Sequence, residues 1–210
     1  MEKTDWKKNE KSLYLPGTKP EPVTISRLWF LAVDGRGEPG SANFSARVET
    51  LFGLSYAIKM AVKKGTSPFE PCDYAVYPLE GIWDLEPGAT YVEGAPIDKK
   101  ALTYTLQIRQ PAFVTSNYVQ EVMRMTSAKK PELPLDGVRF ESFEEGPCWQ
   151  MLHKGSFDEE PKSFALLKSH MEAARLRRQS HSHREIYLSD FRKTAPAALR
   201  TVLRVGVVPA

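Results

Sequence analysis

The order of strand-like and helix-like periodicity repeats once along the chain. In the first half, the pattern predicts a strand, a helix and two strands, at residues 23–37, 43–65, 73–85 and 101–111. In the second half, the same order is expected at residues 138–155, 160–178, 183–190 and 199–208. The sequence therefore predicts an α+β fold of duplicated β-α-β-β units with an antiparallel sheet. Such units place both helices on one face and leave a face or a central cleft free for a ligand.

Punctuating residues give the expected limits of these elements. Ser41 or Asn43 can cap the first helix and Gly65 can end it, while Thr115 can cap a connecting helix. The charged and proline-rich start of the chain indicates a flexible arm. We expect the arm, repeat one, the connecting helix and repeat two at residues 1–22, 23–112, 115–130 and 137–208.

Composition indicates a globular protein of the cytoplasm. The 210 residues are 41% hydrophobic and 26% charged, with a net charge of +3 that gives no argument for nucleic acid. The N-terminus lacks the apolar core of a signal peptide, and no apolar run is long enough for a membrane span. Cys72 and Cys148 fit free thiols in a reducing compartment, with a single disulfide as the alternative. The oligomeric state stays open.

The stretch "HREIYLSD", residues 183–190, predicts a strand with two different faces. Ile186 and Leu188 project to one side, and Glu185 and Tyr187 project to the other. The apolar side can meet a core. The hypothesis is therefore that Glu185 and Tyr187 face a ligand cleft on the opposite side.

Two carboxylates are candidate catalytic groups. Glu185 in a partly apolar cleft could accept a hydrogen bond, pair with a ligand cation or orient a water. The alternative is a solvated glutamate or one paired with Arg184 or Arg109. Glu80, in "PLEGIW", could share acid and base work with it in the same cleft. The alternative for Glu80 is an ordinary turn residue after Pro78.

Four aromatic residues are candidates for the walls of a ligand cleft. Aromatic faces stack on flat ligands and attract cations. Trp83, Tyr104 and Tyr187 fit this role, although aromatic residues mostly fill cores. Trp149, in "GPCWQM", fits core and cleft equally.

The histidines and glycines suggest no metal or cofactor. His181 and His183 form an H-x-H pair that lacks an evident third ligand. The basic stretch "RLRRQSHSHR" is typical of a helix end and turn. The sequence contains no nucleophile elbow and no dinucleotide or phosphate-binding glycine pattern.

Several ordered motifs resemble GyrI-like small-molecule-binding proteins. They are "YAVYPLEGIWDL", "YTLQIRQPAFVT", "VRFESFEEGPCWQMLHKGSFDEEP" and "EIYLSDFRKTAPAALRTVLR", and the resemblance runs from about Val23 to Val208. It implies a duplicated SHS2-type fold whose cleft follows a pseudo-two-fold axis, with Glu185 as the ligand-binding carboxylate. The chain is most similar to a stand-alone subgroup that includes cyclopropanoid cyclopropyl hydrolases. Those enzymes open the strained ring of DNA-alkylating compounds and protect the cell.

Three positions depart from the subgroup's pattern. Asp84 follows Trp83 where a second tryptophan is usual, Phe157 replaces a tyrosine and Phe191 replaces a proline. The substrate is therefore expected to differ from the relatives' substrates. The resemblance implies a cofactor-independent hydrolase for an aromatic small molecule. The alternatives are a drug-binding or sequestering module without chemistry, and a regulator that acts through a protein partner.

Overall fold

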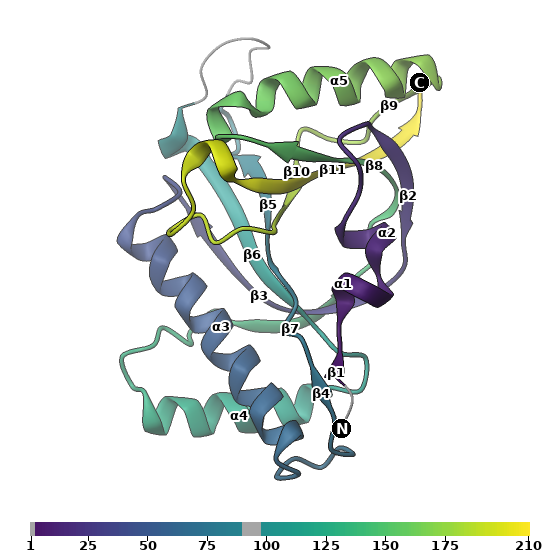
Figure 1. Ribbon diagram of the computed structural model, residues 1–210. Helices are drawn as coiled ribbons and strands as arrows, with labels where there is room; N and C mark the ends of the chain where they lie inside the picture. The colour runs from purple at the N-terminus through teal and green to yellow at the C-terminus, as the bar shows by residue number, and fades with distance from the viewer. Residues whose placement is uncertain (1–2, 90–97) are drawn as a thin grey trace.

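The computed structural model describes residues 3–89 and 98–210 and has a large curved antiparallel sheet (Figure 1). Neighbouring strands follow the order β2-β8-β11-β10-β5-β6-β3-β7, and β9 pairs with β11. The strands of this sheet are β2 (Glu21–Ile25), β3 (Leu28–Arg36), β5 (Leu79–Leu85), β6 (Leu102–Gln110), β7 (Arg139–Phe143), β8 (Gly146–Lys154), β9 (Leu176–Arg178), β10 (His183–Tyr187) and β11 (Arg200–Pro209). Two short parallel strands, β1 (Lys3–Thr4) and β4 (Asp73–Tyr74), form a separate pair.

The duplicated unit is visible in the strand order. One repeat is β3-α3-β5-β6 and the other is β8-α5-β10-β11, with α3 (Ala42–Lys63) and α5 (Glu160–Ala173) as the helices. The two repeats join where β5 pairs with β10. The strand before each repeat pairs with the other repeat, since β2 pairs with β8 and β7 pairs with β3. The predicted α+β fold of duplicated units with an antiparallel sheet is confirmed.

Helix α3 forms where the periodicity predicts it. The Ser41 hydroxyl accepts a hydrogen bond from the Phe44 amide over 3.2 Å, and Gly65 ends the helix with a φ of 68°. The buried side of α3 packs on the first repeat's strands through Phe44, Val48, Leu51, Leu54, Ile58 and Val62. The predicted Thr115 cap is also present, and α4 (Ser116–Lys129) packs against α3.

Four predicted boundaries differ from the structure. Residues 23–37, 73–85 and 138–155 each form two strands rather than one. Helix α5 ends at Ala173, because Arg175 adopts a φ of 58° and the chain then forms β9. The first part of the basic segment, which we expected at the end of a helix, therefore forms β9 beside β11.

The N-terminal segment differs from the flexible arm that we expected. It forms α1 (Trp6–Asn9) and α2 (Lys11–Tyr14), and both Trp6 and Tyr14 are buried. The two rings pack on Ile186 and Val202, which lie on the sheet face opposite α3 and α5. Aromatic burial thus holds the segment in place although its composition is charged and proline-rich.

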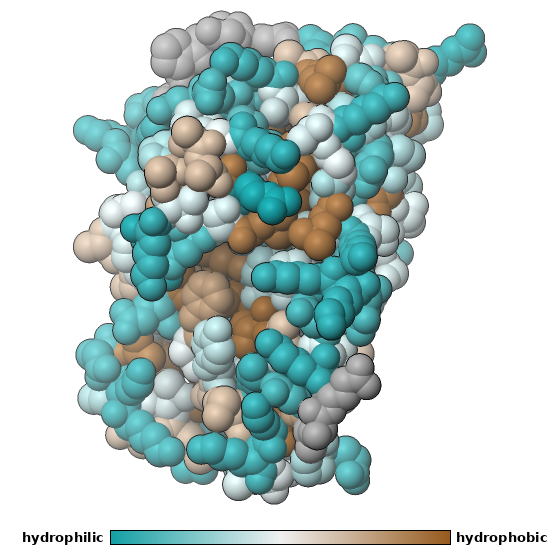
Figure 2. Space-filling model, viewed as in Figure 1, coloured by the Kyte–Doolittle hydropathy of each residue, from teal (hydrophilic) through white to brown (hydrophobic). Residues whose placement is uncertain are grey.

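The remaining short helices are three 3₁₀ turns, η1 (Lys99–Ala101), η2 (Phe157–Glu159) and η3 (Pro196–Ala198). In the described part of the chain, no helix has the length and apolarity needed to cross a membrane. Figure 2 shows hydrophilic residues around the rim of the viewed face and hydrophobic surface in a recess at its centre. The recess lies between α3 and the N-terminal helices.

Candidate functional site

A chain of hydrogen bonds joins the two repeats at the centre of the sheet. Strand pairing places Trp83 of β5 on the same face as Glu185 and Tyr187 of β10. Trp83 Nε1 donates to the Tyr187 hydroxyl over 2.8 Å, and that hydroxyl donates to Glu185 Oε2 over 2.8 Å. All three residues are at least 90% buried. The indole and the phenol therefore hold one carboxylate oxygen in a fixed direction.

Gly81 is what allows these side chains to converge. It lies directly opposite Glu185 in the β5–β10 pairing. A Cβ at this position would lie 2.7 Å from Trp83 Nε1 and 3.1 Å from the Tyr187 hydroxyl. A residue with a side chain would displace one or both groups, so the site needs glycine here.

The second oxygen of Glu185 meets a histidine, and the carboxyl group also meets a second glutamate. His183 Nε2 lies 3.1 Å from Glu185 Oε1. Glu160, the first residue of α5, forms a side-chain hydrogen bond with Glu185. Both glutamates are only 7% exposed. Two buried carboxyl groups in contact favour a state in which one of them carries a proton.

Glu160 is the member of the pair whose pKa is raised. Burial raises the pKa of Glu160 well above its usual value, and the charge and hydrogen bond of Glu185 raise it further. Burial and the neighbouring Glu185 carboxylate also raise the pKa of Tyr187, so its hydroxyl stays neutral and can donate. Glu185 therefore accepts a hydrogen bond from the neutral Tyr187 hydroxyl and forms another with a carboxyl group that holds its proton more tightly than usual.

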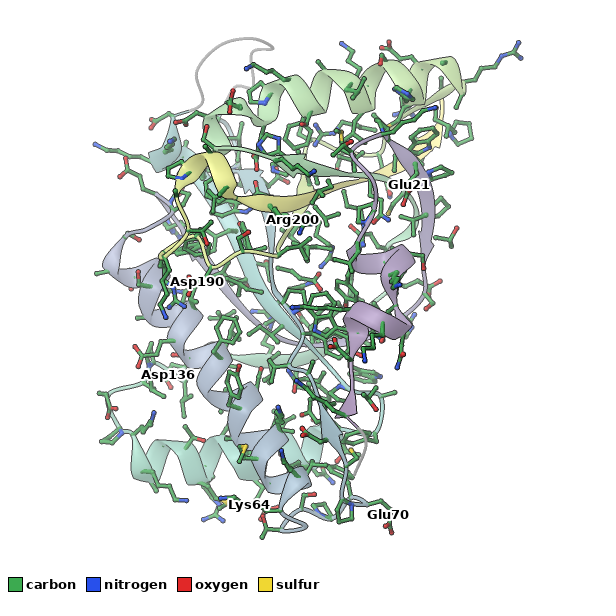
Figure 3. The ribbon with its side chains drawn as sticks, viewed as in Figure 1. Glu21, Lys64, Glu70, Asp136, Asp190 and Arg200 are labelled. Carbon is green, nitrogen blue, oxygen red and sulfur yellow. The ribbon has the colours of Figure 1, made fainter. Side chains whose placement is uncertain are left out.

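Aromatic rings surround this carboxyl pair. Phe157 and Phe191 lie 6.1 Å and 5.4 Å from the Tyr187 ring, and both are half-buried. Phe191 follows Asp190, which Figure 3 labels in the loop beside α3, and this loop leads to Arg200 at the start of β11. The Phe191 ring also contacts Phe44 of α3 at 6.0 Å. Phe157 and Phe191, both from the second repeat, form the more exposed side of the cluster, and Phe44 from the first repeat is buried beneath them.

Comparisons with known proteins agree with this architecture. No protein-family model and no curated protein matches the sequence. Among solved structures, the chain is similar to an uncharacterized conserved protein from Listeria innocua, with 37% identity and a TM-score of 0.89 over 98% of this chain and 100% of the other. It is also similar to a hydrolase from Listeria innocua, with 35% identity and a TM-score of 0.87 over 98% and 100%.

The C-terminal domain of EcmrR shares the fold, with 11% identity and a TM-score of 0.52 over 91% of this chain and 98% of that domain. The identity with the Listeria proteins over nearly complete chains decides the family. This chain belongs to the same family as these Listeria proteins, and it has the GyrI-like fold. The GyrI-like fold that the motifs implied is thereby confirmed.

In this GyrI-like protein, the structure brings together four of the six residues that we predicted for the site. Glu185, Tyr187 and Trp83 are joined by the hydrogen bonds described above. Tyr104 lies beside Trp83 with its ring 5.0 Å away, and its buried hydroxyl has no hydrogen-bond partner among the described residues. Ile186 meets a buried cluster on one face of β10, as we expected, but α3 and α5 also cover the Glu185 face, so both faces of the strand are buried.

Glu80 does not share a cleft with Glu185. It pairs with Ile186 across the β5–β10 junction, so its side chain leaves the opposite face of the sheet. There its Oε2 accepts a hydrogen bond from Arg184 Nη1 over 2.7 Å. The expected division of acid and base work between Glu80 and Glu185 is therefore incompatible with this geometry.

Trp149 lies apart from the site. Its half-buried ring packs under α5 with Met151, Leu167 and Val205, and lies 6.3 Å from His170. This places Trp149 in the core of the second repeat. The described residues also contain no group of three or more His, Cys, Asp or Glu side chains arranged for a metal ion.

Glu160 is the site residue that the sequence analysis missed. It stands in "DEEP", where acidic residues before a proline are typical of the first turn of a helix. This local explanation gives no reason to expect the contact with Glu185, which lies 25 positions away along the chain. The only local signal is its place at the start of the second repeat's helix, which the fold directs toward the β5–β10 junction.

Proposed function

We propose that this GyrI-like protein is a cofactor-independent hydrolase that binds flat aromatic molecules and opens the cyclopropane ring of DNA-alkylating cyclopropanoid compounds. One observation carries the proposal: the buried carboxyl group of Glu185 is hydrogen-bonded to Tyr187 and Glu160 inside a cluster of aromatic rings. The similarity to a hydrolase from Listeria innocua along almost the whole chain supports hydrolytic chemistry.

The aromatic cluster would bind the flat part of the substrate. Trp83 and Tyr187 offer fixed ring faces, while Phe157 and Phe191 are half-buried and lie in loop or 3₁₀ segments. Entry of a ligand requires these two outer rings to move aside. Stacking on the inner rings would then bring the strained ring next to Glu185, and stacked aromatic pairs contribute about 0.5–1.5 kcal/mol each.

The proposed reaction adds water across the strained carbon–carbon bond. The substrate has a spiro-cyclopropane conjugated to a dienone. A water held by Glu185 attacks the cyclopropane methylene carbon while the strained bond breaks. The electron pair of that bond moves through the ring to the carbonyl oxygen, which becomes a phenolate. Glu185 accepts the proton that the water loses, and this proton reaches the phenolate through solvent.

The residues around Glu185 would orient it rather than react. Tyr187 and Glu160 donate to its oxygens and so limit the directions from which a water can be held. Relief of ring strain and formation of an aromatic phenol supply most of the driving force. The protein then contributes orientation and a fixed electrostatic environment. The ring-opened product can no longer alkylate DNA, which would protect the cell.

A turnover assay tests this proposal. Wild-type protein and Glu185→Gln are each mixed at substoichiometric amounts with a cyclopropane-bearing alkylator, followed by ultraviolet absorbance and mass spectrometry. We expect many equivalents of a water-added product from the wild type and a loss of at least tenfold in Glu185→Gln.

The matched control is Glu159→Gln. Glu159 immediately precedes Glu160, but its exposed side chain pairs with Lys162 rather than with the site. It should retain wild-type turnover. Stoichiometric binding without product would instead identify a drug-binding or sequestering module, since the same rings and carboxylate can also hold a flat cation.

A further inference from the structure

A network of buried charges lies on the sheet face opposite Glu185. Arg184 precedes Glu185 in β10, so its side chain leaves the other face. Arg184 Nη1 donates to Glu80 Oε2 over 2.7 Å, and Arg184 Nε donates to Glu145 Oε2 over 3.0 Å. The side chains of Arg184 and Glu80 are each only 2% exposed. The ion pair therefore joins β5 to β10 directly behind the Glu185 site.

The N-terminal helices close this network from solvent. Arg204 Nη1 lies 3.5 Å from Glu145 Oε2, and Arg204 Nη2 donates to the Leu13 carbonyl oxygen, so Arg204 ties the network to α2. A cavity of about 10 Å³ lies between the N-terminal helices and the sheet, and its lining includes Tyr14, Glu80 and Arg184. This space holds one water at most. The Glu80–Arg184 pair is thus shielded, and its geometry is set by protein contacts.

Stability alone does not account for such a pair. Taking two charges out of water costs about as much free energy as their attraction returns, and well-packed apolar residues are often equally stable. Removing one partner is different, because the other charge is then buried without compensation. The pair therefore penalises any arrangement of β5 and β10 in which its two members do not meet.

The register of β5 and β10 is the property that the pair selects. Arg184 lies opposite Ile82 and Glu80 lies opposite Ile186, so the pair runs diagonally across the two strands. The same register places Glu185 opposite Gly81. A slip of one residue would turn Glu185 to the other face, and a slip of two would place a large side chain opposite it.

We propose that Glu80 and Arg184 are positioning residues, which lock the β5–β10 register and thereby place Glu185, Trp83 and Tyr187 in contact. This assignment rests on the proposed function for its kinetic readout. It gives Glu80 a role that differs from the acid–base role suggested by the sequence, because Glu80 acts through the sheet without touching the ligand.

The test compares Arg184→Met, Glu80→Met and the double variant. Arg184→Met leaves Glu80 buried without its ionic partner, and Glu80→Met leaves Arg184 with Glu145 alone, so each single variant should lower the melting temperature. The double variant removes both charges while Glu145 keeps Arg204 at 3.5 Å, and it should recover most of that loss. Its kcat should nevertheless stay about tenfold to a hundredfold below the wild-type value, because small displacements of a reacting group have effects of this size. A double variant with wild-type kcat overturns the proposal.

Two further variants keep the test decisive. Glu80→Gln preserves shape and one acceptor, so it should fold even where Met does not, with kcat between those of the wild type and the double variant. Wild-type kcat in Glu80→Gln together with a lowered melting temperature overturns the proposal. Arg139→Met removes an exposed pair with Asp34, 2.8 Å long, and serves as the matched control.

A readout without ligand separates this inference from the proposed function. If the wild type shows no turnover, the hydrolase proposal fails, but the backbone amides of Gly81 and Glu185 still report the β5–β10 junction. Their hydrogen exchange should be at least tenfold faster in the double variant than in the wild type and Arg139→Met. Equal exchange rates in all three proteins overturn the positioning role.

Discussion

The protonated Glu160 predicts an unusual dependence of stability on pH. Its side chain is 7% exposed, and its pKa is raised well above 4.5, first by burial and then by Glu185. In the unfolded chain the same group loses its proton at its ordinary pKa. Between these two values the native state binds one more proton than the unfolded state.

The sign of the effect follows from proton linkage. Where the native state binds more protons, the free energy of unfolding falls as pH rises. The favourable contribution is complete below pH 4.5 and is lost as pH rises through the raised pKa of Glu160. The slope for one proton is at most about 1.4 kcal/mol per pH unit. Replacement of Glu160 by an uncharged isostere should remove this slope.

Urea unfolding at a series of pH values from about 5 to 8 measures the effect. We expect Glu160→Gln to unfold with a flatter pH dependence than the wild type and to be the more stable protein at the upper end of the range. Glu159→Gln is the control, because the pKa of Glu159 is lowered by Lys162 and its proton equilibrium lies below this range. An identical pH slope in the wild type and Glu160→Gln would refute the raised pKa of Glu160.

Three other substitutions test the packing around the site. Gly81→Ala would push a methyl group into Trp83 and Tyr187. We expect at least a tenfold lower kcat and a free energy of unfolding in urea that is lower by about 1–3 kcal/mol. Unchanged turnover would mean that the hydrogen-bonded chain is not needed. Trp83→Phe keeps an aromatic ring but removes the donor to Tyr187. This should lower the free energy of unfolding by about 1 kcal/mol and weaken ligand affinity measured by calorimetry. Wild-type affinity would contradict a role for the indole nitrogen. Trp6→Ala removes a buried ring and its hydrogen bond to Val76, which should cost about 3–5 kcal/mol in urea unfolding; a negligible loss would indicate a loosely attached arm after all.

Local sequence patterns predicted the helices and strands well, because each helix or strand depends mainly on residues that are neighbours in the sequence. Apolar spacing, the Ser41 cap and Gly65 together specify α3, and the structure has a helix there. Strand alternation likewise predicted that Glu185 and Tyr187 share a face. Both features follow from backbone geometry within a single element.

The same local patterns could not predict how strands that are distant in the sequence pair with each other. Glu80 and Glu185 each stand in a strand, but only the β5–β10 register shows that they project from opposite faces. Glu160 illustrates the same limit, because its partner lies in another element and its local context is that of an ordinary helix start. Both faces of β10 are buried, and the N-terminal helices cover one of them. The sequence of β10 alone therefore could not show which face carries the site.

The central claim is that Glu185 holds the water that opens the strained ring. Single-turnover reactions in ¹⁸O-labelled water, with excess protein and a cyclopropane-bearing alkylator, test it by mass spectrometry of product and protein. The account predicts one ¹⁸O atom in the ring-opened alcohol, an unmodified protein, and loss of the labelled product in Glu185→Gln. Substrate covalently attached to Glu185, or an intact bound ligand with no labelled product, would contradict it.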